Sequence, residues 1–450
     1  MPEDETVKDP TNNTLSRWLG RAPGPLFSAY CIAAAFGTYF CMYAFRKPFT
    51  AATYEDAIWF GIGLKTILVA SQTAGYTLSK FIGIKVVSEM PARYRAATIL
   101  VLIGIAEAAL LLFAMTLAPW NAIWLFVNGL PLGMVFGLVL GFLEGRRVTE
   151  ALSAGLCASF IVSSGFVKSV GRSLMLDFGI SANWMPFVTG LLFVVPLLIF
   201  VWMLAKIPPP SQADESLRSK RTPMGKSERR LFLRRHFWGL TGLLTIYMLI
   251  TLVRSIRDDF AVEIWRELGV TDETDVFARS EFWVMLGVIT INAFAVMIKS
   301  NRVAFLTSIG LIGSGFFVVI ASIIGQRSGI LSPMSFMVLI GFGMYIPYVA
   351  FHTTVFERMF AAFREVGTIG YLMYLADAIG YLGYVAVMVF RNTDTGKREY
   401  LNLLNWLSFS VAVVSMAIAV LLGIYYSRRL PRHDGATPEL ELSAATLENA

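Results

Sequence analysis

Charged side chains interrupt several of the long apolar runs in this sequence. An ionisable group that lies deep in a bilayer costs roughly 3 kcal/mol or more, so each one is a candidate for function unless it pairs locally or its tip reaches water. The basic residues of this kind are Arg46, Lys47, Lys80, Lys168, Arg172, Arg254 and Arg257. The acidic ones are Glu107, Glu144, Asp258, Asp259 and Asp377.

Arg46 and Arg254 occupy matching positions, near the end of the first apolar run in the N-terminal and in the C-terminal part of the chain. The planar guanidinium group can hold a carboxylate or a phosphate with two parallel hydrogen bonds, and it stays charged. Two such groups that face each other would bind an anion, with Lys80 and Lys168 adding positive charge. Alternatively, Arg254 pairs with Asp258 one turn along its own helix, and the other basic groups extend to the membrane interface.

Glu107 and Asp377 lie near the centres of their apolar runs. Carboxyl groups at that depth are candidates for proton coupling or for internal salt bridges, and the sequence leaves both interpretations open. His352 lies near the end of its run, where it could shuttle protons or simply pack against its neighbours.

The sequence lacks the motifs of common metal and cofactor sites. Its three cysteines have no CxxC spacing, and its three histidines form neither an HExxH motif nor a convincing triad. Neither a Walker A sequence nor a haem attachment motif occurs, so an ATP-driven pump and a cytochrome have no support. We therefore expect no bound metal, no cofactor and no enzymatic activity.

Composition indicates the medium in which the apolar runs lie. Of 450 residues, 56% are hydrophobic and only 15% are charged, which leaves a soluble protein too little polar surface to cover its apolar mass. Continuous apolar runs of about 20 residues predict membrane-spanning helices, because barrel strands would alternate in hydrophobicity. The twelve runs lie near residues 26–47, 62–87, 96–117, 121–144, 150–172, 184–206, 238–260, 281–299, 303–325, 332–354, 366–390 and 401–427.

The twelve runs form two sets of six around a polar central stretch, as duplication of a six-helix unit would leave them. The sequence thus predicts an all-α integral membrane protein with two pseudo-symmetric six-helix bundles. Basic residues concentrate in alternate loops, which places both termini in the cytoplasm and the chain in the inner (plasma) membrane. The predicted parts are a cytoplasmic tail (1–25), an N-terminal bundle (26–206), a cytoplasmic basic loop (207–237), a C-terminal bundle (238–427) and a cytoplasmic tail (428–450).

At these residues the sequence resembles the major facilitator superfamily, and within it the organophosphate:phosphate antiporters. That branch carries an Arg-Lys-x-Phe pattern after an aromatic-rich helix 1, a Ser-Lys-Phe segment on helix 2 and an arginine on helix 7. The matching residues here are Tyr43, Arg46, Lys47 and Phe49, then Ser79, Lys80 and Phe81, then Leu252, Val253, Arg254 and Asp259. The resemblance implies that Arg46 and Arg254 bind a substrate phosphate and that Lys80 assists them.

A second resemblance is closer. The segments YAFRKPFTA and GYTLSKFIGIKVVSEM are similar to those of an uncharacterised bacterial family of membrane proteins of the same superfamily type. This resemblance implies the twelve-helix fold but no substrate.

Together these features predict a secondary active transporter that moves a small anionic solute, such as phosphate or an organic phosphate, by alternating access. The expected contacts are this solute and membrane lipid, with no nucleic acid, and the protein is expected to be a monomer. An alternative is a transporter-like sensor that binds the solute without net transport and contacts a partner through its basic central loop. Contact of that loop with the anionic leaflet is the simpler interpretation.

Overall fold

The computed structural model of the chain describes residues 14–54, 58–59, 61–144, 146, 149–209, 226–271, 273–363, 369–390 and 399–430. Parts of the predicted cytoplasmic tails and the middle of the predicted central loop, at residues 1–13, 431–450 and 210–225, lie outside these residues.

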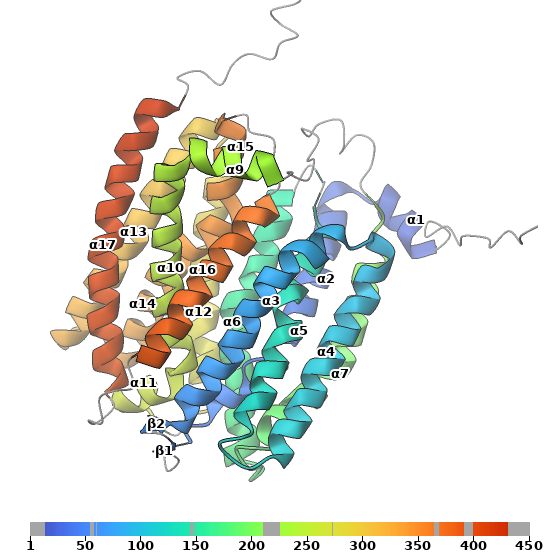
Figure 1. The fold of residues 1–450 in the computed structure, drawn as a ribbon, viewed down its shortest axis with the longest axis vertical. Coiled ribbons are helices and arrows are strands. Elements are labelled where there is room, and N and C mark those ends of the chain that lie inside the picture. The colour runs from blue at the N-terminus through green and yellow to red at the C-terminus, as the bar shows by residue number, and fades with distance from the viewer. Residues whose placement is uncertain are drawn as a thin grey trace, which may run out of the picture.

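Among the described residues, twelve long helical segments form the body of the molecule, and this confirms the predicted fold class (Figure 1). Eleven of them are long and apolar enough to cross a membrane, and α3 has the length but carries more polar residues. The first six are α2 (Gly24–Ala44), α3 (Leu64–Glu89), α4 (Ala92–Met115), α5 (Ala122–Leu140), α6 (Thr149–Leu176) and α7 (Met185–Ala205). The second six are α10 (Phe237–Asp259), α12 (Val276–Val296), α13 (Asn301–Arg327), α14 (Pro333–Ala350), α16 (Ile369–Phe390) and α17 (Tyr400–Arg429).

The remaining elements mark the two ends of the helices (Figure 1). At one end, here called the hairpin end, lie η2 (Pro48–Ala51), the strands β1 (Ile58–Trp59) and β2 (Ile62–Gly63), and α11 (Ala261–Glu267). At the opposite end, called the α9 end, lie α1 (Thr14–Arg21), α9 (Lys226–Arg235) and α15 (Phe356–Phe363). The described N- and C-terminal helices, α1 and α17, both reach the α9 end, as an even number of spans requires.

Local sequence signals explain where several helices begin and end. Prolines stand in the first turn of α2, α7 and α14, where the missing N–H costs no hydrogen bond. The Ser332 hydroxyl caps α14 by accepting a hydrogen bond from the Ser335 N–H. Beyond the end of α13, Gly329 adopts a left-handed conformation with φ of 71°, which a side chain would disfavour.

Within the N-terminal half, α3 and α5 pack with their backbones in close contact. A Cβ added at Gly75 would lie 2.1 Å from the Phe126 carbonyl oxygen, and one added at Gly129 would lie 2.2 Å from the Gln72 carbonyl oxygen. Such small-residue contacts replace the hydrophobic effect, which does not drive helices together inside lipid. The outward faces are apolar instead: Val195 of α7 is 65% exposed and Leu421 of α17 is 66% exposed.

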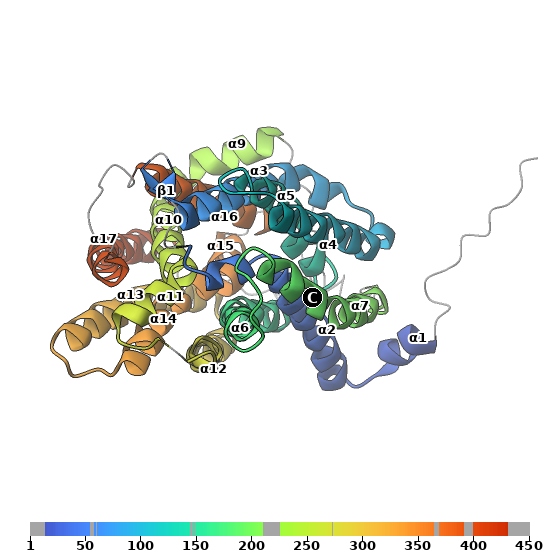
Figure 2. The ribbon, with the colours of Figure 1, turned by 90° about the horizontal axis from the view of Figure 1, so that it is seen from below.

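The two halves meet along two helix pairs. Helix α3 packs against α16, and α6 packs against α12 (Figure 2). Buried ion pairs cross this contact, and they define the site described next.

Candidate functional site

Arg46 is held just beyond the end of α2 by side chains from two other helices. The last carbonyl groups of a helix have no partner within it, so they need hydrogen-bond donors from elsewhere. The Asn128 amide donates 2.9 Å hydrogen bonds to the carbonyls of Phe45 and Ala106, and the Gln72 amide donates at 2.7 Å to the Arg46 carbonyl. Gln72 also donates to the Asn128 side-chain oxygen at 2.8 Å. The backbone of Arg46 is therefore fixed from α3 and α5.

The Arg46 guanidinium lies over an aromatic ring and not beside a carboxylate. Its central carbon is 3.7 Å from the centre of the Tyr76 ring and 5.7 Å from that of Tyr381. On the other half, the guanidinium carbon of Arg254 lies 4.3 Å from the centre of the Tyr348 ring, and its Nη2 donates a 3.4 Å hydrogen bond to the Tyr381 hydroxyl. Tyr381 of α16 thus contacts both arginines.

A small polar cavity separates the two halves at this level, with room for about one water molecule. Arg46 and Arg254 both line it, and each is only 5% exposed. The other lining residues are Tyr43, Lys47, Gln72, Thr73, Ser255, Asp259, Tyr381 and Tyr384. The structure therefore brings together the two arginines that the sequence singled out, 208 positions apart, at one cavity.

Buried charges around this cavity balance except at the two arginines. Apart from Arg146 and Arg358 at the α9 end, seven Lys and Arg side chains are buried among the described residues. Five of them pair with five carboxylates: the cations are Lys47, Lys65, Lys80, Lys168 and Arg257, and the anions are Asp258, Asp259, Glu263, Asp377 and Glu281. Within the described chain no carboxylate forms an ion pair with Arg46 or Arg254, and the Nε atom of each has no hydrogen-bond partner.

Most of the ion pairs lie toward the hairpin end. The Lys47 ammonium is 2.7 Å from Asp258 and 2.5 Å from Asp259, and Tyr384 donates a 2.9 Å hydrogen bond to Asp259. Lys168 also pairs with Asp258. Asp258 therefore has two lysine partners. The alternative interpretation of Arg254 required a pair with Asp258, and the structure does not contain that pair.

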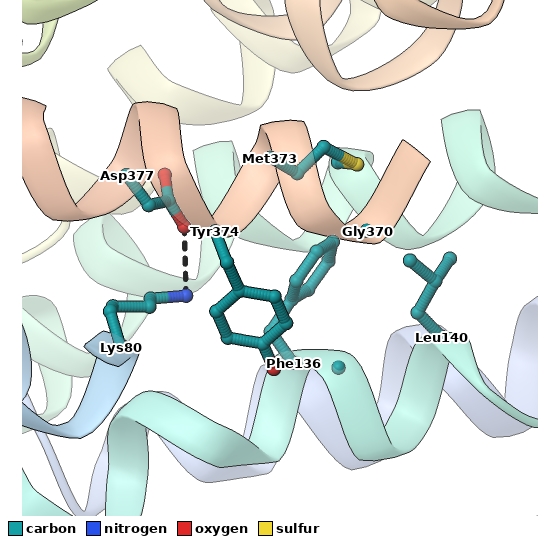
Figure 3. Close-up of a pocket in the computed structure, with 8 residues that line it drawn as sticks. Lys80, Phe136, Leu140, Gly370, Met373, Tyr374 and Asp377 are labelled. Carbon is teal, nitrogen blue, oxygen red and sulfur yellow. Dashed lines mark ion pairs between the residues drawn. The ribbon is translucent and has the colours of Figure 1, made fainter. Parts of the chain in front are cut away.

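The positions of Lys168 and Lys80 qualify their predicted role in anion binding. Each is almost fully buried and pairs with a carboxylate, Lys168 with Asp258 and Lys80 with Asp377 at 2.8 Å (Figure 3). Neither residue lines the arginine cavity. Their positive charges are already compensated, so their contribution to an anion site stays a prediction. For Asp377, the structure contains the internal salt bridge that was one of its two interpretations.

Glu107 lies apart from this cluster. Its carboxylate points at α7, where a Cβ added at Gly190 would lie 2.2 Å from one of its oxygens. Both oxygens are shielded from water and have no hydrogen-bond partner among the described residues. Proton coupling through Glu107 stays a prediction, and its position does not connect it to the arginine cavity.

Sequence reasoning missed two groups of site residues. Lys65 forms a 2.6 Å ion pair with Glu263, although neither was considered; a lysine at the first turn of an apolar helix was the available signal. The tyrosines around the arginines were also missed, apart from Tyr43. The chain has 16 tyrosines, and those at the cavity share no spacing that would distinguish them.

Comparison with known proteins places the chain in a family. Residues 48–429 match the family model described as "Family of unknown function (DUF5690)". The chain belongs to this family. The match covers all of the twelve helices except α2. It agrees with the resemblance of the sequence to an uncharacterised bacterial family of membrane proteins. No curated protein sequence matches the chain.

Solved structures show that the DUF5690 chain has the fold of known transporters. A crystal structure of a D-xylose-proton symporter is similar with a TM-score of 0.55 and 16% sequence identity, over 92% of this chain and 99% of that one. The xylose transporter XylE from E. coli, in a partially occluded inward open conformation, gives a TM-score of 0.53 and 16% identity, over 91% of this chain and 99% of that one. These matches support the major facilitator fold, and none supports the organophosphate:phosphate branch.

Proposed function

We propose that this protein is a secondary active transporter for a small anion with up to two negative charges, such as phosphate or a phosphate monoester. The observation that carries the proposal is the pair of buried arginines without carboxylate partners at one cavity between the halves. The transporter fold of the solved relatives supports the general class of function.

Charge argues for an anion over the neutral sugar named for those relatives. Buried charges are stable when they are paired, and an unpaired one costs several kcal/mol. All five other buried cations near the contact have carboxylate partners, so the excess positive charge is that of Arg46 and Arg254. A dianion would compensate both, whereas a neutral sugar would leave both uncompensated.

Alternating access gives this site its mechanism. Arg46 comes from the N-terminal half and Arg254 from the C-terminal half, so a bound anion would attract both halves to the same point. The cavity as it stands is smaller than a phosphate ion, so the halves must separate to admit one and close around it. Tyr381, in contact with both arginines, would then adjust as the anion replaces it.

The test is counterflow of radiolabelled inorganic phosphate in proteoliposomes, with glycerol 3-phosphate, succinate and xylose as competitors. We expect phosphate counterflow, competition by the anions and none by xylose. Arg46→Gln and Arg254→Gln should each weaken apparent phosphate affinity about tenfold or more, because a charge-assisted hydrogen bond contributes about 1.5–3 kcal/mol. Arg327→Gln makes the same change at an exposed residue of α13 and serves as the control.

Three results would contradict parts of the proposal. Counterflow of xylose but not of phosphate would exclude the anion. Normal counterflow in Arg254→Gln would exclude the arginine site. Thermal stabilisation of the purified protein by phosphate without any counterflow would favour the sensor over the transporter.

A further inference from the structure

A second buried cluster links the halves through Lys80, about one helical turn from the tyrosines that contact the arginines. The Lys80 ammonium on α3 lies 2.8 Å from Oδ2 of Asp377 on α16 (Figure 3). The other oxygen of Asp377, Oδ1, accepts a hydrogen bond from the Tyr247 hydroxyl on α10. Lys80 is thus the contribution of the N-terminal half, and Asp377 and Tyr247 belong to the C-terminal half.

His352 extends this cluster, and its hydrogen bonds define its tautomer. Its Nδ1 lies 2.9 Å from the Tyr348 carbonyl oxygen. A carbonyl oxygen can only accept, so Nδ1 carries a proton and donates it. In the neutral imidazole the other nitrogen, Nε2, is then an acceptor with a free lone pair. This Nε2 faces the Tyr247 hydroxyl oxygen at 3.4 Å.

Counting protons shows a place for one more. Tyr247 has a single hydroxyl proton, and it points to Asp377 because an ionised carboxylate can only accept. The lone pairs of Tyr247 Oη and His352 Nε2 therefore face each other with no proton between them. One added proton on Nε2 would complete the chain, with His352 donating to Tyr247 and Tyr247 donating to Asp377.

An irregular helical turn, aromatic rings and several titratable groups surround His352. His352 is 8% exposed and lies in the π-helical turn η3 (Phe351–Val355), a geometry that recurs at functional sites. The rings of Phe136 and Phe160, from the N-terminal half, lie 6.0 and 5.5 Å from its own. Several titratable or charged groups act on His352 or on Asp377: Tyr247 and Arg254 of α10, Tyr348 of α14, Tyr374, Asp377 and Tyr381 of α16, Lys80 of α3 and Cys157 of α6.

We propose that His352, Tyr247 and Asp377 form a proton-binding site whose occupancy is coupled to the ion pair between Lys80 and Asp377. When Lys80 contacts Asp377, the carboxylate is neutralised and His352 stays neutral. When the halves separate at the α9 end, α3 withdraws Lys80 from Asp377. One proton from water then binds to Nε2 of His352. The resulting imidazolium compensates the charge of Asp377 through the hydrogen bonds of Tyr247. One cation replaces the other, so the buried charge stays constant.

The consequence for transport rests on the proposed function. A proton enters from the opened side when Lys80 leaves and is released when Lys80 returns. If the release is to the opposite side of the membrane, each cycle of the two halves moves one proton across it. The proton is then the coupling ion of the proposed anion transporter. No residue of the proton-binding site lines the arginine cavity, but Tyr348 joins the two sites because it contacts both His352 and Arg254.

The proton-binding site can be tested without transport. The chain has three histidines, so nuclear magnetic resonance of the full-length protein with labelled histidine rings can follow each ring separately. The signal that disappears in His352→Gln is assigned to His352. In Lys80→Met the His352 imidazolium signal should persist to higher pH than in the unaltered protein, by about one pH unit or more. The double variant Lys80→Met with Asp377→Asn should lose this gain. His236 and His433 provide internal references.

A second variant keeps the test decisive if Lys80→Met does not fold. Tyr247→Phe retains both charges but removes the oxygen that would accept from Nε2, so the imidazolium signal should retreat to lower pH. Tyr94→Phe makes the same change at an exposed tyrosine on α4 and should leave the His352 signal unaltered. A His352 signal that responds to neither Lys80→Met nor Tyr247→Phe would overturn the proposal.

Transport of inorganic phosphate gives the separate functional readout. An inward proton gradient should accelerate phosphate uptake into proteoliposomes, and in His352→Gln the ratio of uptake with and without the gradient should fall to about one. Variants are compared at the same gradient, because phosphate itself titrates near neutral pH. Absence of phosphate counterflow in the unaltered protein would refute the proposed solute, whereas the histidine signals would still decide the proton-binding site. Equal acceleration in His352→Gln would overturn the coupling.

Discussion

Lys65 at the start of α3 and Glu263 on α11 form a two-pronged ion pair, with the lysine nitrogen 2.6 and 2.7 Å from the two carboxylate oxygens. The same nitrogen donates a 2.9 Å hydrogen bond to the Thr50 carbonyl, so its donors are fully used. Both side chains are 5% exposed or less. The pair therefore fastens the two halves together at the hairpin end.

Removing one partner of this pair should cost far more than removing both. Lys65→Met leaves Glu263 buried and unpaired, and we expect a loss of about 3–5 kcal/mol in the free energy of unfolding. The double variant Lys65→Met with Glu263→Gln should recover most of that loss. Unfolding in detergent, followed by intrinsic fluorescence, measures all three proteins; an additive double variant would contradict the pairing.

Asn128 should matter for anion binding although it does not line the arginine cavity. Asn128→Leu leaves the carbonyls of Phe45 and Ala106 without their donor and removes one acceptor of Gln72, so the backbone around Arg46 keeps only the hydrogen bond from Gln72. We expect destabilisation of about 1–3 kcal/mol and weaker apparent phosphate affinity. Phosphate counterflow and thermal unfolding measure the two effects. Unaltered affinity in a folded Asn128→Leu protein would show that this network does not position Arg46.

Tyr381→Phe tests the tyrosine that contacts both arginines. The ring stays beside Arg46, but the hydroxyl that accepts from Arg254 is removed. An anion would no longer compete with that hydroxyl for Arg254, so apparent phosphate affinity should rise or stay the same, within about threefold. A loss as large as that of Arg254→Gln would instead make the hydroxyl part of the anion site. Counterflow at several phosphate concentrations separates the two results.

Gly75→Ala tests the close contact between α3 and α5. The added methyl group would lie 2.1 Å from the Phe126 carbonyl oxygen, which belongs to a rigid helix backbone and cannot yield. Overpacking of this kind costs about 1–3 kcal/mol or more, and the melting temperature should fall accordingly. Gly310→Ala is the matched control, since nothing lies within 4 Å of its added Cβ and alanine favours the helix. Equal melting temperatures would mean that α3 and α5 separate readily.

Properties carried by single helices were predictable from the sequence, and properties of their contacts were not. Run length and composition identified the twelve helices, because each apolar run must satisfy its own backbone. The arginine pair followed from its repetition in the two halves. The partner of Asp377 was not predictable, because it depends on the register of α3 against α16.

Ion pairs between distant segments are the clearest case of what the sequence leaves undetermined. Lys65 and Glu263 are 198 positions apart, so no spacing rule connects them. The local rule instead suggested that Arg254 pairs with Asp258 on its own helix. Lys47 and Lys168 from the other half occupy that carboxylate, and Arg254 stays available at the cavity.

The ion pairs given above that join the two halves all have the same polarity. In each one that the structure describes, the N-terminal half contributes the lysine, at Lys47, Lys65, Lys80 or Lys168, and the C-terminal half contributes the acid. If the halves descend from one six-helix ancestor that worked as a homodimer, they have since become complementary and can no longer substitute for each other. Two N-terminal halves would oppose lysine to lysine, which gives the assembling chain an electrostatic means of rejecting the wrong partner.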